Sequence, residues 1–126
     1  MARRRSIDQL QDVPTILGRE VVHVGVIEGH NNYVVLGRVQ GDCEIEGVLL
    51  IGPDCLWTGN ISADTVIVRG RVEGNIHATF KIELRPSARI KGDLSSPMIA
   101  VAEGAVLLGR VSPDSVITRF QERRTH

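Results

Sequence analysis

The chain has 126 residues, the size of a single domain, and fifteen Lys and Arg residues balance fifteen Asp and Glu residues, so the formal net charge is zero. Only 3% of the residues are aromatic whereas thirteen are glycine, so any core must consist of small aliphatic side chains and the chain must turn often. The body is slightly acidic and both ends are basic, which argues against general nucleic-acid binding. Two cysteines and no signal peptide or long apolar run lead us to expect a soluble, cytosolic protein.

The middle of the chain repeats with an offset of 33 residues. The hexapeptide Gly37–Asp42 returns as Gly70–Asn75, and Pro53 returns as Pro86. A shorter unit lies inside this repeat, because glycines recur at intervals of 16, 18, 15, 18 and 17 residues, at positions 25, 41, 59, 74, 92 and 109. Helical-repeat proteins need about 33 residues or more per unit. A unit of about 17 residues instead fits one coil of a β-helix, and the chain has room for about six such coils.

Short pieces rich in β-branched residues lie between the glycines and are the expected strands. In chain order they are 33–36, 48–51, 65–68, 80–84, 105–108 and 115–118. Strict alternation in the fourth piece predicts that Phe80, Ile82 and Leu84 share one face. All four residues of the second piece are apolar, so if Leu49 and Ile51 point inward, Val48 and Leu50 form an exposed apolar strip.

Several motifs, in this order and spacing, resemble the bactofilin family of bacterial polymer-forming cytoskeletal proteins. They are Val26–Gly29, Leu36–Asp42, Val68–Ile76, Gly92–Leu94 and Ala102–Val106. The resemblance implies an all-β chain: a single right-handed, three-sided parallel β-helix with short flexible tails. We expect a flexible basic N-terminal tail at 1–14, the β-helix domain at 15–118 and a short basic C-terminal tail at 119–126.

The resemblance also implies a function. Such a protein would assemble without nucleotide into a homopolymer, by end-to-end stacking of β-helices. It would lie in the cytoplasm at the inner face of the cell membrane, scaffold envelope or cell-wall-associated proteins and help set cell shape. No nucleic-acid partner is expected.

Candidate contact residues follow from the physics of a β-helix, whose two ends expose unpaired backbone groups. Val116, Ile117 and Phe120 would make the C-terminal end adhesive and are candidates for the polymer contact. Val48 and Leu50 are candidates for a lateral contact, as is Trp57 unless it fills a corner of the helix. Three consecutive arginines could attract anionic lipid, or could belong to a solvated tail: Arg3, Arg4 and Arg5.

Nothing in the sequence points to catalysis, a cofactor or a metal. His23, His30 and His77 are scattered without a pattern of supporting carboxylates, and Cys43 and Cys55 are expected to be small buried side chains. No phosphate-binding glycine motif occurs. The alternative function is a non-polymerising protein-binding module resembling the C-terminal domain of the division inhibitor MinC. An enzyme of the hexapeptide-repeat acyltransferase or carbonic anhydrase kind is disfavoured, because the coil spacing is looser than a six-residue rule allows.

Overall fold

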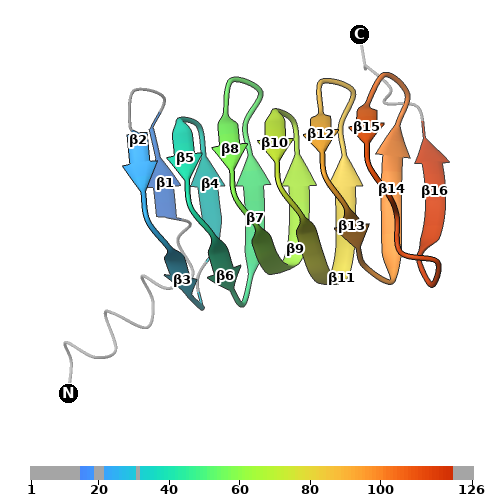
Figure 1. Cartoon of the computed structure of the whole chain (residues 1–126), viewed down its shortest axis with the longest axis horizontal. Coiled ribbons are helices and arrows are strands. Elements are labelled where there is room, and N and C mark those ends of the chain that lie inside the picture. Colours follow the sequence, from blue (N-terminus) through green and yellow to red (C-terminus); the bar gives the residue numbers. More distant parts are fainter. Residues whose placement is uncertain (1–14, 19–21, 31, 121–126) are drawn as a thin grey trace, which may run out of the picture.

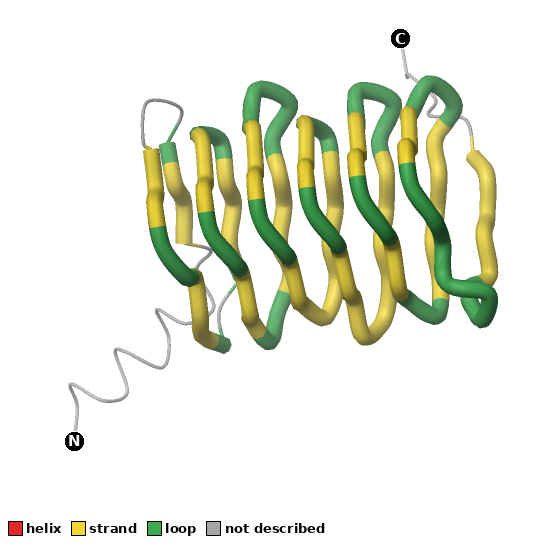
Figure 2. Tube along the Cα trace, viewed as in Figure 1, coloured by secondary structure: helices red, strands yellow, loops and turns green. Residues whose placement is uncertain are grey.

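The computed structural model describes residues 15–18, 22–30 and 32–120, and every regular element in them is a β-strand. The strands pair in parallel and wind into a three-sided solenoid of six coils, shown side by side in Figures 1 and 2. This confirms the all-β prediction and the expected number of coils. The N-terminal tail predicted at 1–14 and most of the C-terminal tail predicted at 119–126 lie outside the described residues.

Each side of the solenoid is a ladder of short strands, which we name faces A, B and C. Face A consists of β2 (Val22–Val24), β5 (Arg38–Gln40), β8 (Leu56–Thr58), β10 (Arg71–Glu73), β12 (Arg89–Lys91) and β15 (Val106–Leu108). Face B consists of β3 (Ile27–Gly29), β6 (Cys43–Ile45), the first parts of β9 (Ile61–Val68) and β11 (Ile76–Leu84), and β13 (Leu94–Ser95). Face C consists of β1 (Thr15–Leu17), β4 (Tyr33–Val35), β7 (Val48–Ile51), the second parts of β9 and β11, β14 (Met98–Ala102) and β16 (Val116–Phe120).

The 33-residue repeat corresponds to two consecutive coils that differ in the turn from face C to face A. The turns at 52–55 and 85–88 have four residues, whereas those at 36–37 and 69–70 have two. The short turn requires glycine, because a Cβ at Gly70 would lie 2.3 Å from the carbonyl oxygen of Gly52. Alternation of long and short turns therefore explains why the larger repeat is clearer in the sequence than the single coil.

A column of stacked glycines forms the corner between faces A and B. At Gly59 the backbone has φ of +141°, and a Cβ there would lie 2.0 Å from the carbonyl oxygen of Gly41 in the preceding coil. Glycine is thus required both for its backbone conformation and for the close approach of successive coils. This column is the origin of the regular glycine spacing.

The core consists of columns of inward side chains, one set from each face, that are almost completely buried. Its members in the central coils are Val39, Trp57, Val72 and Ile90 from face A, Cys43, Ile61, Ile76 and Leu94 from face B, and Leu49, Val66, Ile82 and Ile99 from face C. Trp57 is 0% exposed. It therefore belongs to the core, and its prediction as a lateral contact is wrong, because an inward strand position leaves none of its surface for a neighbour.

The prediction for Phe80 is also wrong. Ala63 pairs with Ala78 and Thr65 pairs with Lys81, so one residue of β9 faces two residues of β11. This bulge shifts the alternation, and Phe80 is 65% exposed while Ile82 and Leu84 are buried. A strictly alternating sequence does not reveal where the extra residue enters a strand.

Candidate assembly surfaces

The C-terminal end of the solenoid leaves the edges of its last strands open. Among the described residues no strand lies beyond β15 or β16, and face B ends in a single bridge between Leu94 and Val111. Unpaired N–H and C=O groups at such edges can accept another strand. The end is therefore a site for backbone pairing with another chain.

Apolar side chains are exposed at this end, beside the polar Thr118 and the charged Arg119 of the same strand. Val116 is 63% exposed and Ile117 is 48% exposed. Ile117 lies in register with buried Ile99, so it is the last member of an inward column, and Leu107 and Val111 pack partly exposed against the core beside it. The end thus exposes side chains of the hydrophobic core that no further described coil covers.

Phe120 lies at the end of β16 and is half-buried. Its carbonyl oxygen accepts a hydrogen bond from the Glu103 amide at 2.9 Å, and its register partner is Ala102. The structure therefore brings the three candidates of the sequence, Phe120, Val116 and Ile117, onto the one terminal strand.

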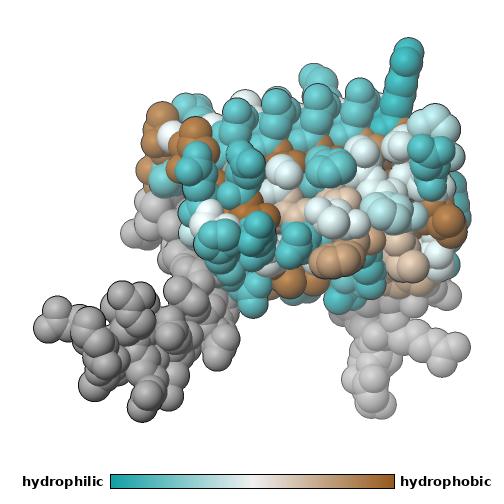
Figure 3. Space-filling model, turned by 90° about the horizontal axis from the view of Figure 1, so that it is seen from below, coloured by the Kyte–Doolittle hydropathy of each residue, from teal (hydrophilic) through white to brown (hydrophobic). Residues whose placement is uncertain are grey.

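The N-terminal end carries exposed apolar side chains that the sequence analysis missed. Val22, Val24 and Val26 are 63%, 70% and 57% exposed. Figure 3 shows hydrophobic side chains at this end of the molecule, on the left. His23 alternates with these valines and lies in register with buried Val39, and its Nε2 atom is buried without a hydrogen-bond partner among the described residues. The alternation was a usable signal, but valines at such spacing are normally assigned to the core.

Face C carries the expected apolar strip. Leu49 and Ile51 are fully buried, so Val48 and Leu50 point outward, and both are half-buried. The register aligns Leu50 with Val34 and Ile67 on the neighbouring strands. The strip therefore spans three coils on the outer surface of face C.

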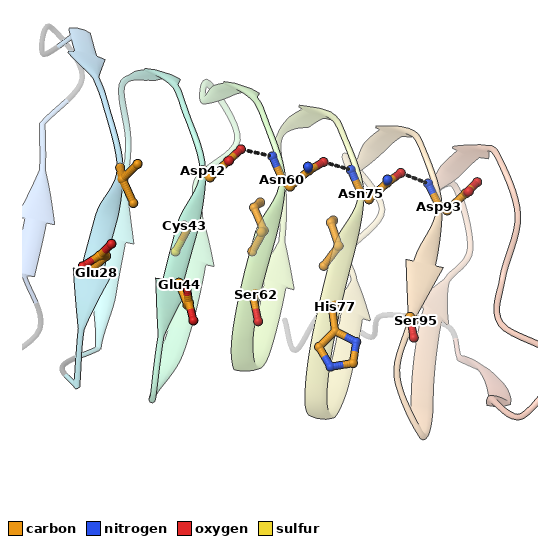
Figure 4. A pocket seen from close by; sticks show the side chains of 13 residues that line it. Glu28, Asp42, Cys43, Glu44, Asn60, Ser62, Asn75, His77, Asp93 and Ser95 are labelled. Carbon is orange, nitrogen blue, oxygen red and sulfur yellow. Dashed lines mark hydrogen bonds between the residues drawn. The ribbon is translucent and has the colours of Figure 1, made fainter.

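A ladder of side-chain hydrogen bonds runs beside the glycine column at the corner of faces A and B (Figure 4). The Oδ1 atom of Asp42 accepts from the amide of Asn60 at 3.0 Å, and Asn60 and Asn75 repeat the contact to the next coil at 3.1 and 3.0 Å. The ladder ends where Asp93 accepts from the amide of Arg110. These bonds satisfy corner N–H groups that no strand pairs, and so hold successive coils in register.

The outer surface of face B is a shallow groove beside this ladder. Outward positions on its strands carry Glu28, Glu44, Ser62, His77 and Ser95, with exposed Asp42 and Asp93 at the corner. No group of three or more His, Cys, Asp or Glu residues able to hold a metal ion is found within the described part of the chain.

Both cysteines are free and buried, as the sequence indicated. Burial raises the pKa of Cys43 and of Cys55 to about 12, because the low-polarity interior disfavours the thiolate. Neither thiol is therefore an effective nucleophile or metal ligand at neutral pH.

Two further points concern membranes. Arg3, Arg4 and Arg5 lie outside the described residues. Over the part of the chain that is described, there is no helix of the length and hydropathy needed to cross a bilayer.

The geometry defines a class of protein: a short three-sided β-solenoid with open, apolar ends. The profile described as "Bactofilin: Polymer-forming cytoskeletal" matches residues 15–112. The chain belongs to the bactofilin family, which is a family of structural cytoskeletal proteins.

Individual relatives agree with this assignment. Bactofilin BacO of Myxococcus xanthus (strain DK1622) is 34% identical over 100 residues, which cover 79% of each chain. Bactofilin BacP of the same strain is 32% identical over 102 residues, which cover 81% of this chain but 42% of BacP. The solid-state NMR structure of the cytoskeletal bactofilin BacA has a TM-score of 0.72 at 27% identity, covering 88% of this chain and 100% of that one. The chain thus spans less than half the length of BacP.

Proposed function

We propose that this protein forms cytoskeletal filaments by end-to-end stacking of its β-solenoids, without nucleotide and without catalysis. The observation that carries the proposal is the exposed core at the C-terminal end. Ile117 is the last residue of an inward column, yet it is 48% exposed. Removing that apolar surface from water and pairing the edge of β16 would both stabilise an end contact. The polymer-forming description of the family supports the same conclusion.

The test is negative-stain electron microscopy of the purified full chain, without nucleotide or metal, beside two variants. Ile117→Lys places a charge at the end of the core column and should abolish filaments or leave only short ones. Thr118→Lys adds the same charge on the same strand, at an outward position in register with Ala100, and should leave filaments intact. Discrete dimers or trimers in the wild type would overturn the proposal and favour the non-polymerising binding module instead.

Filaments of this kind would scaffold envelope-associated proteins on the cytoplasmic face of the membrane and help set cell shape. Contact with lipid through Arg3, Arg4 and Arg5 would add about 1 kcal/mol per charge near an anionic surface. Flotation with vesicles containing anionic lipid tests this part. Replacing the three arginines by serine should abolish co-flotation if they make the contact, and unchanged co-flotation would contradict it.

A further inference from the structure

The solenoid separates its surface charges by face. Among the outward positions of the described face A strands, four are cationic, Arg38, Arg71, Arg89 and Lys91, and one is acidic, Glu73. The strands of face B carry no Lys or Arg, and their outward side chains include Glu28 and Glu44. Asp42 and Asp93 at one corner of face B, and Glu46 and Asp64 at the other, add to its negative charge. Arg110, beside Asp93, is the cation of the first corner, and Glu46 is hydrogen-bonded to His30.

The register places like charges side by side on both faces. Arg71 of β10 is the direct partner of Arg89 of β12 on face A. Glu28 of β3 is the direct partner of Glu44 of β6 on face B, where Figure 4 shows them on adjacent strands. Neighbouring strands are only about 4.8 Å apart, and like charges directly opposite one another destabilise a sheet. A partner surface of opposite charge would therefore offset the repulsion between like charges on each face.

The arginines of face A remain available to such a partner. Arg38 and Arg71 are exposed. The Nη1 atom of Arg89 donates to the carbonyl oxygens of Ala88 at 2.9 Å and of Gly104 at 3.3 Å. These neutral acceptors orient the guanidinium but leave its charge uncompensated.

On face A the charged positions avoid the terminal strands. Face A carries its cations in central coils, and its terminal strands present outward Val22 and Val24 at one end and Val106 and Leu108 at the other. The outward side chains of face A are therefore apolar on its two terminal strands and mostly charged on β5, β10 and β12. The end-contact candidates on β16 and the charged residues of faces A and B are different residues, so the two kinds of contact can be tested separately.

We propose that face A of one copy docks on face B of a second copy of this chain, so that filaments associate laterally through opposite charges. The growth of this contact into sheets or bundles of filaments rests on the proposed function. Because the two copies use different faces, each pair leaves one face A and one face B free, and the association continues into sheets or bundles. Since the contact is between exposed charges, it weakens as salt shortens the Debye length from about 10 Å at 0.1 M to about 3 Å at 1 M.

The test measures lateral association against NaCl concentration by electron microscopy and by low-speed pelleting, which collects bundles. Wild type should form bundles that separate into single filaments as salt rises. Arg71→Glu and Glu44→Arg should each lower the NaCl concentration at which bundles separate. The combined variant Arg71→Glu with Glu44→Arg should restore it towards the wild-type value, because the charges are exchanged between the two faces. Lys81→Glu on face C has the same change in net charge as Arg71→Glu and should leave bundling unchanged.

The outcomes separate this inference from the proposed filament. Filaments whose bundling is equally affected by Arg71→Glu and Lys81→Glu would overturn face-specific docking while leaving the filament intact. Absence of filaments would contradict the proposed function, and salt-sensitive self-association measured by sedimentation would then decide whether face A still binds face B. Arg71→Glu could instead abolish co-flotation with anionic vesicles without altering bundling. In that case face A contacts lipid rather than another copy, and the inference fails.

Discussion

The indole Nε1 of Trp57 donates a hydrogen bond to the carbonyl oxygen of Gly41, 3.1 Å away across neighbouring coils. Trp57 projects inward from face A, whereas Gly41 belongs to the glycine column at the corner. One side chain thus fills the interior and also anchors the corner of the preceding coil. Among the other inward positions of the described face A strands only His23 carries a polar aromatic ring, and its Nε2 has no hydrogen-bond partner among the described residues.

Trp57→Phe should therefore lower the free energy of unfolding by about 1–3 kcal/mol. The substitution removes the hydrogen bond and leaves a small cavity, but keeps most of the aromatic volume. Chemical denaturation of the full chain, followed by circular dichroism, measures the change. A variant as stable as the wild type would show that the hydrogen bond to Gly41 contributes nothing.

Gly59→Ala should be far more damaging than Gly25→Ala, although both glycines have positive φ. A Cβ at position 59 would lie 2.0 Å from the oxygen of Gly41, whereas one at position 25 would meet no atom of the described residues within 4 Å. Gly25→Ala should thus cost only the backbone strain, about 1–2 kcal/mol. Gly59→Ala should cost more than about 3 kcal/mol or prevent folding. Thermal unfolding compares them, and equal losses would show that backbone conformation alone explains the glycine.

Asn75→Ala should destabilise the corner ladder by about 0.5–1.5 kcal/mol, because the amide of Asp93 loses its acceptor at 3.0 Å. Asn75→Asp keeps an oxygen at that position and should retain most of the stability. The two denaturation midpoints provide the measurement. If both variants lose the same amount, the hydrogen bond is not what Asn75 contributes.

Cys43 and Cys55 should resist thiol reagents in the folded protein. Raising a thiol pKa from 9.0 to about 12 lowers its thiolate fraction at pH 8 by about a thousandfold, and burial also excludes the reagent. Reaction with an aromatic disulfide at pH 8 should be slow in buffer and complete in denaturant. Rapid labelling of either cysteine in buffer would contradict the buried positions.

Phe120→Arg should leave the solenoid folded and shorten or abolish polymers. The residue is half-buried on the terminal strand, so a charge there interferes with an end contact more than with the interior. Electron microscopy and circular dichroism together distinguish the two effects, with Thr118→Arg as the matched control. Long polymers that persist unchanged would exclude Phe120 from the contact.

Much of the fold was predictable because the solenoid repeats its local chemistry. The glycine spacing followed from the sequence and matches the stacked glycines of the corner column. Four consecutive apolar residues left the inward direction of Leu49 and Ile51 open, and their burial shows that both point inward. Phe80 was misplaced because a corner accepts either one or two residues, and alternation on each side of it looks the same. The valines at the N-terminal end were missed because an exposed terminal strand has the same pattern as a buried one.

Charge segregation was not predictable for a related reason. Coils differ in length by up to three residues, so the sequence alone does not show which outward residues align. Arg71 and Arg89 are 18 residues apart whereas Leu56 and Arg71 are 15 apart, yet all three lie in one row. Only the register reveals that arginines gather on one face and glutamates on another.

Gly25, the first glycine of the corner column, offers a test of how another copy would fit against the N-terminal end. Every later glycine from position 41 to 109 along the corner column has the backbone of the preceding coil against it, whereas a Cβ at Gly25 would have no described residue within 4 Å. If another copy covers this end at the distance that separates coils, a single methyl group at position 25 would hold the two copies apart. Gly25→Ala would then prevent assembly while the monomer, destabilised only by backbone strain, stays folded.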